Sequence, residues 1–258
     1  MSFLNLLEKH ISYTSAGEVR EICHPLFEQF NLNYFDYVRV YPDGSTIILI
    51  SNRDWYYHFC KSNYPVSSTI VNSGIHLWSH YITKQAVKDP AQYFNHHNGI
   101  TIFVPNKNYI EFFDIAAPSS NRGALDFYFN RMDILNQFLF YFKDKASNLI
   151  DKSYKNRFMI PDTMKGSKIE IPTYDDFLKA IAVKKFHMNF QSKEVILTKR
   201  EYECLMHLSR GKTMKETAKK LKLSPRTIED HLVSAREKTD FISRAKMIDA
   251  FLENLIFW

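Results

Sequence analysis

Glycine and cysteine are scarce in this chain of 258 residues, and their positions exclude several kinds of site. The seven glycines are scattered, so the sequence has no glycine-rich loop to hold a phosphate group. The three cysteines, Cys23, Cys60 and Cys204, lie far apart, which is not the spacing of a zinc site or a disulfide framework. We therefore expect free thiols in a reducing compartment.

Targeting and membrane segments are lacking as well. The stretch MSFLNLLEKHIS contains an acid and has neither the basic start nor the cleavage site of a signal peptide. No apolar run approaches the roughly 18 residues that a membrane span needs. These absences predict a cytoplasmic protein with no membrane partner.

Residues that could support catalysis or bind a metal are also sparse. His76 and His80 are four residues apart, but no cysteine or acid completes a metal shell beside them. His58 and Cys60 are two apart in an expected helix and would point in different directions, whereas catalysis needs a base aimed at the thiol. We therefore predict no catalytic residue, no metal, no cofactor and no enzyme activity.

Positive charge is concentrated toward the C-terminal end. The whole chain carries a formal charge of +6, and residues 193–258 hold 14 Lys and Arg against 10 Asp and Glu, a net of +4. Such an excess in a small segment favours a nucleic acid as its partner. We expect a sensor-like domain over residues 1–150, a linker with short connecting elements over 151–192 and a DNA-binding domain over 193–258.

Signals for the start of a helix divide this last segment into short amphipathic helices. Thr198 and Glu201 have the spacing of a capping box, and Gly211 stands where a left-handed residue ends a helix, which predicts a helix over 199–209. Thr213 and Glu216 repeat the box for a second helix. Only a short link separates the two, as in a helix-turn-helix.

Ser224 followed by Pro225 predicts the start of a third helix, because proline is favoured at the first helical position. Ile228, Leu232 and Ala235 recur at helical spacing and should face inward. The outer face would then be offered to the major groove of DNA. It carries Arg226, Glu229, Asp230, Val233, Arg236 and Glu237.

Many positions of this segment, in order, match a known pattern. They are Leu197, Thr198, Arg200, Glu201, Leu205, Leu208, Gly211, Lys215, Glu216, Ala218, Leu221, Ser224, Arg226, Thr227, Ile228, Glu229, His231, Leu232, Lys238, Ser243 and Arg244. The segment resembles the DNA-binding domain of LuxR-type transcription regulators. It departs from that pattern at Thr217, where an aliphatic residue is typical, and at Thr239 and Asp240.

The resemblance implies that outward residues of the third helix read DNA bases, with Arg226, Glu229, Asp230 and Val233 as candidates. A carboxylate would accept from a cytosine amino group and Val233 would meet a thymine methyl. Alternatively, Glu229 and Asp230 pair with Arg226 and touch no base. Phosphate contacts are expected near helix ends. The candidates are Lys199, Lys212, Thr213, Lys215, Ser224, Thr227, Arg236 and Lys238.

The first part of the chain predicts an α+β domain, PAS/GAF-like, in which helices flank an antiparallel sheet. A helix is expected over 15–30, one hairpin around Pro42-Asp43-Gly44 and another around Asn106-Lys107-Asn108. Asp89-Pro90 indicates a helix start, and residues 125–150 indicate a long helix. Its apolar stripe belongs to the core or makes a dimer contact. Thr173-Tyr174-Asp175-Asp176 and the alternation around Met188 predict a short helix and a small hairpin.

The resemblance to LuxR-type regulators extends over roughly residues 30–145. In members that respond to acyl-homoserine lactones, a tryptophan, a tyrosine and an aspartate hold the lactone head group. Here Trp55 matches the tryptophan, while Phe59 and Ser68 replace the tyrosine and the aspartate, and Trp78 resembles a second tryptophan. The two tryptophans line a ligand pocket or simply pack in the core. Neither Phe59 nor Ser68 supplies the missing negative charge.

Together these observations predict a sequence-specific, bacterial transcription regulator that binds double-stranded DNA at a two-fold operator as a homodimer. Apolar residues from Met247 to Trp258 exceed what one small domain should bury, which favours the dimer. A small hydrophobic ligand, which need not be an acyl-homoserine lactone, is expected to modulate it. The alternative is a ligand-independent regulator whose N-terminal domain is a protein-interaction module.

Overall fold

The computed structural model describes residues 8–66, 74–164, 177, 180–191 and 193–255. The chain forms two compact units, residues 1–171 and residues 172–258. Within the described part of the chain, no helix is both long enough and apolar enough to cross a bilayer. The short helix predicted at Thr173-Tyr174-Asp175-Asp176 lies outside the described residues.

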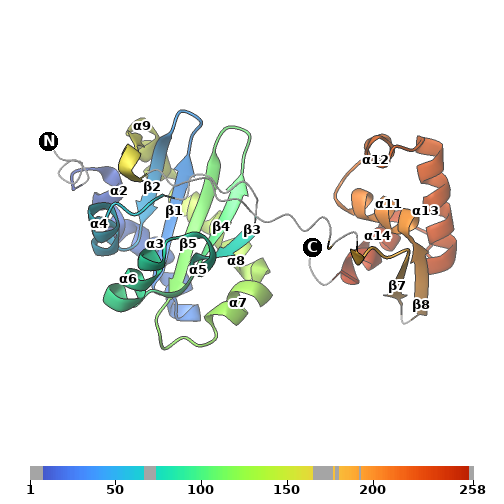
Figure 1. The fold of residues 1–258 in the computed structure, drawn as a ribbon, viewed down its shortest axis with the longest axis horizontal. Coiled ribbons are helices and arrows are strands. Elements are labelled where there is room, and N and C mark those ends of the chain that lie inside the picture. The colour runs from blue at the N-terminus through green and yellow to red at the C-terminus, as the bar shows by residue number, and fades with distance from the viewer. Residues whose placement is uncertain (1–7, 67–73, 165–176, 178–179, 192, 256–258) are drawn as a thin grey trace. The chain divides into compact units, whose positions relative to one another are not determined.

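The N-terminal unit is built on a six-stranded antiparallel sheet (Figure 1). Its strands occur in the spatial order β3-β4-β5-β1-β2-β6. Both predicted hairpins are present, and Gly44 at the first turn has a φ of +81°, a value that favours glycine. The strands are β1 (Tyr34–Val40), β2 (Ser45–Ile50), β3 (Gly74–Leu77), β4 (His97–Pro105), β5 (Ile110–Ala117) and β6 (Phe158–Met159).

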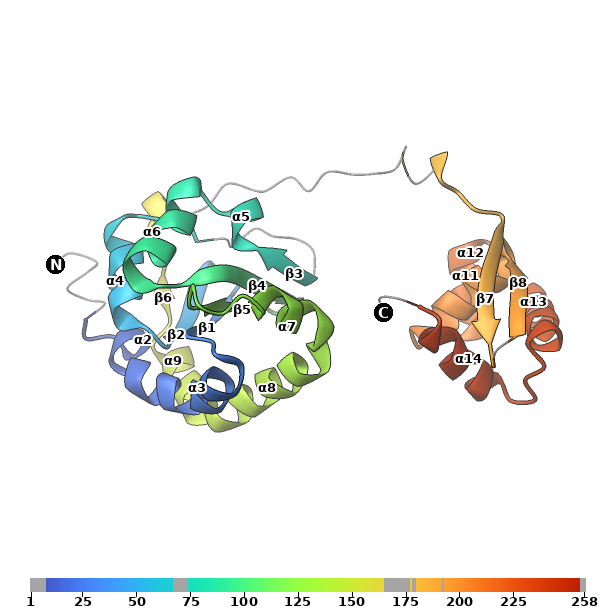
Figure 2. The same ribbon diagram turned by 90° about the horizontal axis from the view of Figure 1, so that it is seen from below.

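Alternation along the central strands divides the side chains between the two faces of the sheet. Phe35 and Tyr37 of β1 join the core under one set of helices, whereas Val38 joins the other. Figure 2 shows the sheet between these layers. One layer holds α3 (Ala16–Phe30), α7 (Ala124–Asn130), α8 (Met132–Lys145) and α9 (Ser147–Lys155); the other holds α4 (Arg53–Lys61), α5 (Trp78–Tyr81) and α6 (Lys84–Phe94), and α2 (Ile11–Thr14) precedes α3.

Two helix predictions in this unit are wrong. The helix expected over 125–150 is three helices, because Arg131 and Ala146 leave helical geometry between α7, α8 and α9. The helix expected to begin at Asp89-Pro90 begins earlier, because the Thr83 hydroxyl caps α6 by accepting from the backbone N–H of Ala86. Asp89 and Pro90 therefore lie inside α6.

The unit also extends beyond residue 150, where the linker was expected to begin. Helix α9 runs to Lys155, and the short strand β6 pairs with β2. A 3₁₀ helix, η1 (Asp162–Met164), follows and places Met164 in the core beneath the sheet. Part of the segment predicted to be a linker thus lines the cavity described below.

In its described part from residue 185 to residue 255, the C-terminal unit combines a hairpin with four helices. Strands β7 (Lys185–Phe190) and β8 (Lys193–Thr198) form the predicted small hairpin. Met188, Phe190, Val195 and Leu197 of this hairpin are buried in the same core as the helices. The hairpin therefore belongs to the predicted DNA-binding domain. Residue 193, where that domain was expected to start, lies within the hairpin. The helices are α11 (Lys199–Ser209), α12 (Met214–Leu221), α13 (Pro225–Thr239) and α14 (Arg244–Glu253).

Candidate functional site

Capping boxes fix where helices α11 and α12 begin. The Thr198 hydroxyl accepts from the N–H of Glu201, and the Glu201 carboxylate accepts from the N–H of Thr198. Thr213 and Glu216 make the same reciprocal pair at the start of α12. Gly211 between them has a φ of +73°, as the sequence predicted for the end of α11.

Helix α13 begins at Pro225, and the Ser224 hydroxyl caps it by accepting from the N–H of Thr227. Ile228, Leu232 and Ala235 are buried against α11 and α12, as their spacing predicts. The opposite face of its first two turns is left open to solvent. Arg226 and Asp230 are exposed there, and Arg236 is exposed further along.

Glu229 and Val233 are placed differently from these fully exposed residues. The Glu229 carboxylate accepts from the Arg244 guanidinium at 3.0 Å, so it is tied to the start of α14. Val233 is half-buried, and it lines a small hollow between α13 and α14 together with Glu229. In the part of the chain that the structure describes, neither Glu229 nor Asp230 forms the ion pair with Arg226 that was the alternative to base reading.

Lys238 also has an internal partner. Its ammonium lies 2.8 and 2.7 Å from the two carboxylate oxygens of Glu201, which is buried. The Ser234 hydroxyl donates to the same carboxylate at 2.7 Å. Burial alone would raise the pKa of Glu201, but these donors and the Thr198 N–H hold that pKa below its usual value. Lys238 therefore fastens α13 to α11, and the phosphate contact predicted for it stays a prediction.

The other predicted phosphate ligands are at the surface. Lys212 and Lys215 are exposed beside the start of α12, and Lys199 is exposed but 3.9 Å from Glu203. Thr213 and Ser224 are the N-cap residues of α12 and α13, and Thr227 lies in the first turn of α13. The N-terminal end of a helix favours an anion. Thr227 and Arg236 belong to α13 itself.

The two threonines that depart from the LuxR-type pattern are both buried. Thr239 donates its hydroxyl to the carbonyl oxygen of Ala235 at 2.9 Å. Thr217 is completely buried, and among the described residues its hydroxyl has no hydrogen-bond partner. The first substitution is thus accommodated, while the second leaves a polar atom unsatisfied in the core.

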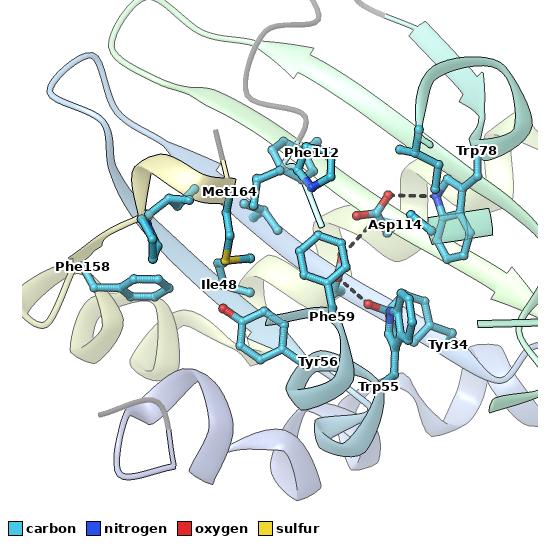
Figure 3. A pocket seen from close by; sticks show the side chains of 18 residues that line it. Tyr34, Ile48, Trp55, Tyr56, Phe59, Trp78, Phe112, Asp114, Phe158 and Met164 are labelled. Atoms are coloured by element: carbon cyan, nitrogen blue, oxygen red, sulfur yellow. Dashed lines mark hydrogen bonds between the residues drawn. The ribbon is translucent and has the colours of Figure 1, made fainter. Parts of the chain in front are cut away.

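A cavity opens on the α4–α6 face of the N-terminal sheet, with about 780 Å³ of space that protein atoms leave empty, its mouth included (Figure 3). Aromatic and aliphatic side chains form most of its wall. The lining residues are Tyr34, Asp36, Val38, Ile48, Trp55, Tyr56, Phe59, Pro65, Val66, Trp78, Ile82, Ala86, Phe112, Asp114, Phe158, Ile160, Pro161 and Met164.

Three of the four predicted pocket residues line this cavity. Trp55 and Phe59 come from α4, and Trp78 begins α5. Ser68 lies outside the described residues. Trp55 and Trp78 are also nearly fully buried, so they serve as core and cavity wall at once. The two interpretations of these tryptophans, core packing and pocket lining, are not exclusive.

Trp78 is held in place by a glycine and a carboxylate. Its ring lies directly on Gly99 of β4, where a Cβ atom would overlap it. Its indole N–H donates to Asp114 Oδ1 at 3.1 Å, and the Thr101 hydroxyl donates to the same oxygen. Gly99 lies in the first strand of the hairpin predicted around Asn106-Lys107-Asn108. Its neighbours in the sequence do not indicate that Trp78 lies against it.

Sequence reasoning missed the two acids in the cavity wall, Asp36 and Asp114. They occupy directly opposed positions on β1 and β5. The Tyr34 hydroxyl donates to Asp36 at 2.6 Å, and the backbone N–H of Asp114 donates to Asp36 at 3.3 Å. Each acid follows two aromatic residues in a strand, in Tyr34-Phe35-Asp36 and in Phe112-Phe113-Asp114. This repeated placement of an acid in an aromatic strand could have indicated the two residues from the sequence.

A buried carboxylate, that of Asp89, also joins two helices beside the cavity. Asp89 of α6 accepts from His58 of α4 at 2.8 Å and from the hydroxyl of Tyr64. The hydrogen bond from Tyr64 is the main reason that the pKa of Asp89 is lowered. This cluster ties α4 to α6, and so it fixes the helix that carries Trp55 and Phe59.

The fold and surface of the C-terminal unit define a helix-turn-helix domain of the DNA-binding type. Residues 195–251 match the family described as "Bacterial regulatory proteins, luxR family". The chain therefore carries a LuxR-family helix-turn-helix domain at its C-terminal end. No protein with a curated description matches the sequence.

Solved structures of LuxR-type proteins are similar over much of the chain. A crystal structure of Escherichia coli SdiA is 15% identical, covers 93% of this chain and 90% of that chain, and has a TM-score of 0.40. SdiA in complex with octanoyl-rac-glycerol is also 15% identical, covering 97% and 92% with a TM-score of 0.40. The N-acylhomoserine lactone dependent factor CepR2 from Burkholderia cenocepacia is 11% identical, covering 57% and 99% with a TM-score of 0.37.

Proposed function

We propose that this protein is a transcription regulator that binds DNA by inserting the start of α13 into the major groove. The observation that carries the proposal is the LuxR-family domain, in which α13 is packed on one side and open on the other. Helix-turn-helix proteins present the N-terminal residues of their second helix to base edges in this way.

The surface side chains of α13 and of the neighbouring helix starts divide into base readers and phosphate ligands. Arg226 and Asp230 are the proposed base readers, with Val233 contributing an apolar contact. Glu229 reaches a base only if its ion pair with Arg244 breaks. We therefore propose that Glu229 orients α14 in the free protein. The proposed phosphate ligands are Lys199, Lys212, Thr213, Lys215, Ser224, Thr227 and Arg236.

Binding as a homodimer to a two-fold operator is part of the proposal. Met247 and Phe251 of α14 are buried in the domain's own core, so much of the apolar stripe expected at a dimer contact is used internally. In the N-terminal unit, however, Phe129 and Phe140 are 49% and 66% exposed on α7 and α8. Apolar surface of this kind favours a contact between copies. A dimer would place two recognition helices about one DNA turn, ~34 Å, apart.

We further propose that a small hydrophobic molecule in the N-terminal cavity changes the affinity of the dimer for DNA. The cavity has the apolar lining of a small-molecule site, with a few polar groups among it. A ligand that binds one arrangement of the dimer more tightly than another shifts the population toward it. Ligand binding in the cavity would shift this population, and the C-terminal domain would then bind DNA with a changed affinity.

Selection of duplexes from a random pool with the full-length protein tests this function. The selected sequences should share a two-fold motif, and DNA affinity should change when a molecule that raises the melting temperature of the protein is added. A selected pool with no common motif would contradict the DNA-reading role. Unchanged DNA affinity with every stabilising molecule would contradict ligand control and leave DNA reading intact.

A further inference from the structure

Two carboxylates meet in the wall of the N-terminal cavity. Asp36 and Asp114 are paired residues on neighbouring antiparallel strands, so their side chains project from the same face of the sheet. Both line the cavity, and Asp36 is only 7% exposed. The indole N–H of Trp78 donates to Asp114 (Figure 3). The hydroxyl of Tyr34 donates to Asp36.

Two like charges opposite each other in a buried place are unfavourable. Accordingly, burial and then the neighbouring Asp114 raise the pKa of Asp36 well above its usual value. Within the described residues, no lysine, arginine or histidine makes an ion pair with Asp36, whose oxygens accept from Tyr34 and from the Asp114 backbone. A cation placed between the carboxylates would relieve their repulsion.

The opposite end of the cavity is apolar. Ile48, Phe158 and Met164 lie at that end in Figure 3, away from Asp114 and Trp78, and Phe112 lies between. The cavity is therefore polar and acidic at one end and hydrocarbon-lined at the other. A molecule that fills it needs a head rich in hydrogen-bond donors and an apolar tail.

We propose that the ligand is a small apolar amine, with its ammonium group between Asp36 and Asp114 and its hydrocarbon tail toward Met164. This inference rests on the proposed function, since it names the chemical class of the signal for the same cavity. Charge-assisted hydrogen bonds to carboxylates are stronger than neutral ones, so the head group determines selectivity. A carboxylate head would meet two acids and be rejected, and an alcohol would lose the charge.

Calorimetric titration of the full-length protein at pH 7 with n-octylamine, 1-octanol and octanoate tests the inference, because the three probes share nearly the same tail. We expect octylamine to bind at least about tenfold more tightly than octanol, because a hydrogen bond between an ammonium and a carboxylate is stronger than one from a neutral hydroxyl. Octanoate should bind most weakly. Equal affinities for octylamine and octanol, or no binding of octylamine, would overturn the proposal.

Asn substitutions separate the head-group site from the rest of the cavity. Asp36→Asn and Asp114→Asn should each lower the affinity for octylamine about tenfold and change that for octanol less than about twofold. Asp144→Asn, which removes an exposed carboxylate on α8, is the control and should change neither. Because each cavity variant removes one of two like charges, its melting temperature without ligand should not fall, which verifies folding. Unchanged octylamine affinity in both folded variants would contradict the proposal.

Measurement of DNA affinity distinguishes a failure of this inference from a failure of the proposed function. Octylamine that binds through Asp36 and Asp114 but leaves DNA affinity unchanged would support the head-group site and contradict ligand control. Octanol that binds and changes DNA affinity, while octylamine does neither, would support ligand control and contradict the amine.

Discussion

The ammonium of Lys238 lies 2.7 Å from Oε2 of Glu201, so the last turn of α13 is tied to the first turn of α11. Glu201 thereby serves two purposes, because the same carboxylate closes the capping box with Thr198. Replacing it by Gln should leave the half-buried Lys238 ammonium without its counter-charge. We expect Glu201→Gln to lower the free energy of unfolding by about 1–3 kcal/mol in chemical denaturation.

The pH dependence of this contact has a definite sign. The pKa of folded Glu201 is held below the 4.5 of the unfolded chain, so its stabilisation is complete above that value. It is lost as the pH falls from about 4.5 through the folded pKa, and Glu201→Gln should remove that part of the acid sensitivity. Glu203→Gln, which breaks only surface ion pairs with Arg200 and Lys199, is the control and should cost less than about 1 kcal/mol. Equal costs for the two variants would contradict the role given to Glu201.

The unsatisfied hydroxyl of Thr217 predicts a stabilising substitution. Valine has nearly the same shape, so Thr217→Val should raise the free energy of unfolding by about 1 kcal/mol. Thr239→Val is the matched comparison, because the Thr239 hydroxyl has a partner and its loss brings no such gain. Thermal unfolding of both variants measures the difference. A Thr217→Val protein less stable than the parent would show that the hydroxyl is satisfied.

His96 predicts a second pH effect, in the N-terminal unit. Burial is the main reason that its pKa is lowered to about 4, against 6.5 in the unfolded chain. The unfolded chain therefore takes up a proton first, so stability contributed by neutral His96 is complete above pH 6.5 and is lost as the pH falls toward 4. The difference amounts to about 3 kcal/mol.

Denaturation of His96→Gln between pH 4 and pH 7 measures this contribution. The variant should lose less stability over that range than the parent, even if it is less stable at pH 7. His24→Gln, at a side chain that is 63% exposed, is the control for the loss of a histidine. Parallel curves for His96→Gln and the parent would contradict the prediction.

The contact between Gly99 and Trp78 predicts a coupled loss of stability and ligand binding. A methyl group at Gly99 would occupy the position of the indole ring, which must then move from Asp114. We expect Gly99→Ala to cost about 1–3 kcal/mol of stability, as overpacking does, and to weaken binding in the cavity. Gly17→Ala adds the same methyl where nothing lies within 4 Å and should be neutral or slightly stabilising. Calorimetric titration with a cavity ligand would then show weaker binding for Gly99→Ala alone.

What the sequence predicted well was local. The capping boxes of α11 and α12, the Ser224-Pro225 start of α13 and the two hairpin turns depend on residues a few positions apart. Each therefore leaves a readable pattern in a single sequence. The inward face of α13 followed from helical periodicity for the same reason.

What the sequence did not predict depends on contacts between distant residues. Asp36 and Asp114 are 78 positions apart and meet only because β1 pairs with β5. Lys238 reaches Glu201, and Arg244 reaches Glu229, through helix packing that no local spacing encodes. Strand β6 is only two residues long and adds to β2 from far along the chain, so its segment read as a linker.

The insertion of α13 into a DNA groove is tested most directly by the salt dependence of binding to a selected duplex, measured by fluorescence anisotropy. For about six phosphate contacts, affinity should fall about 10³-fold between roughly 50 and 200 mM salt. Replacing both Lys212 and Lys215 by alanine should reduce the slope by about two contacts, whereas Arg226→Ala should cost about 1–3 kcal/mol on the selected duplex and relax its preference. Failure to bind duplex DNA at low salt, with or without a cavity ligand, would contradict the account.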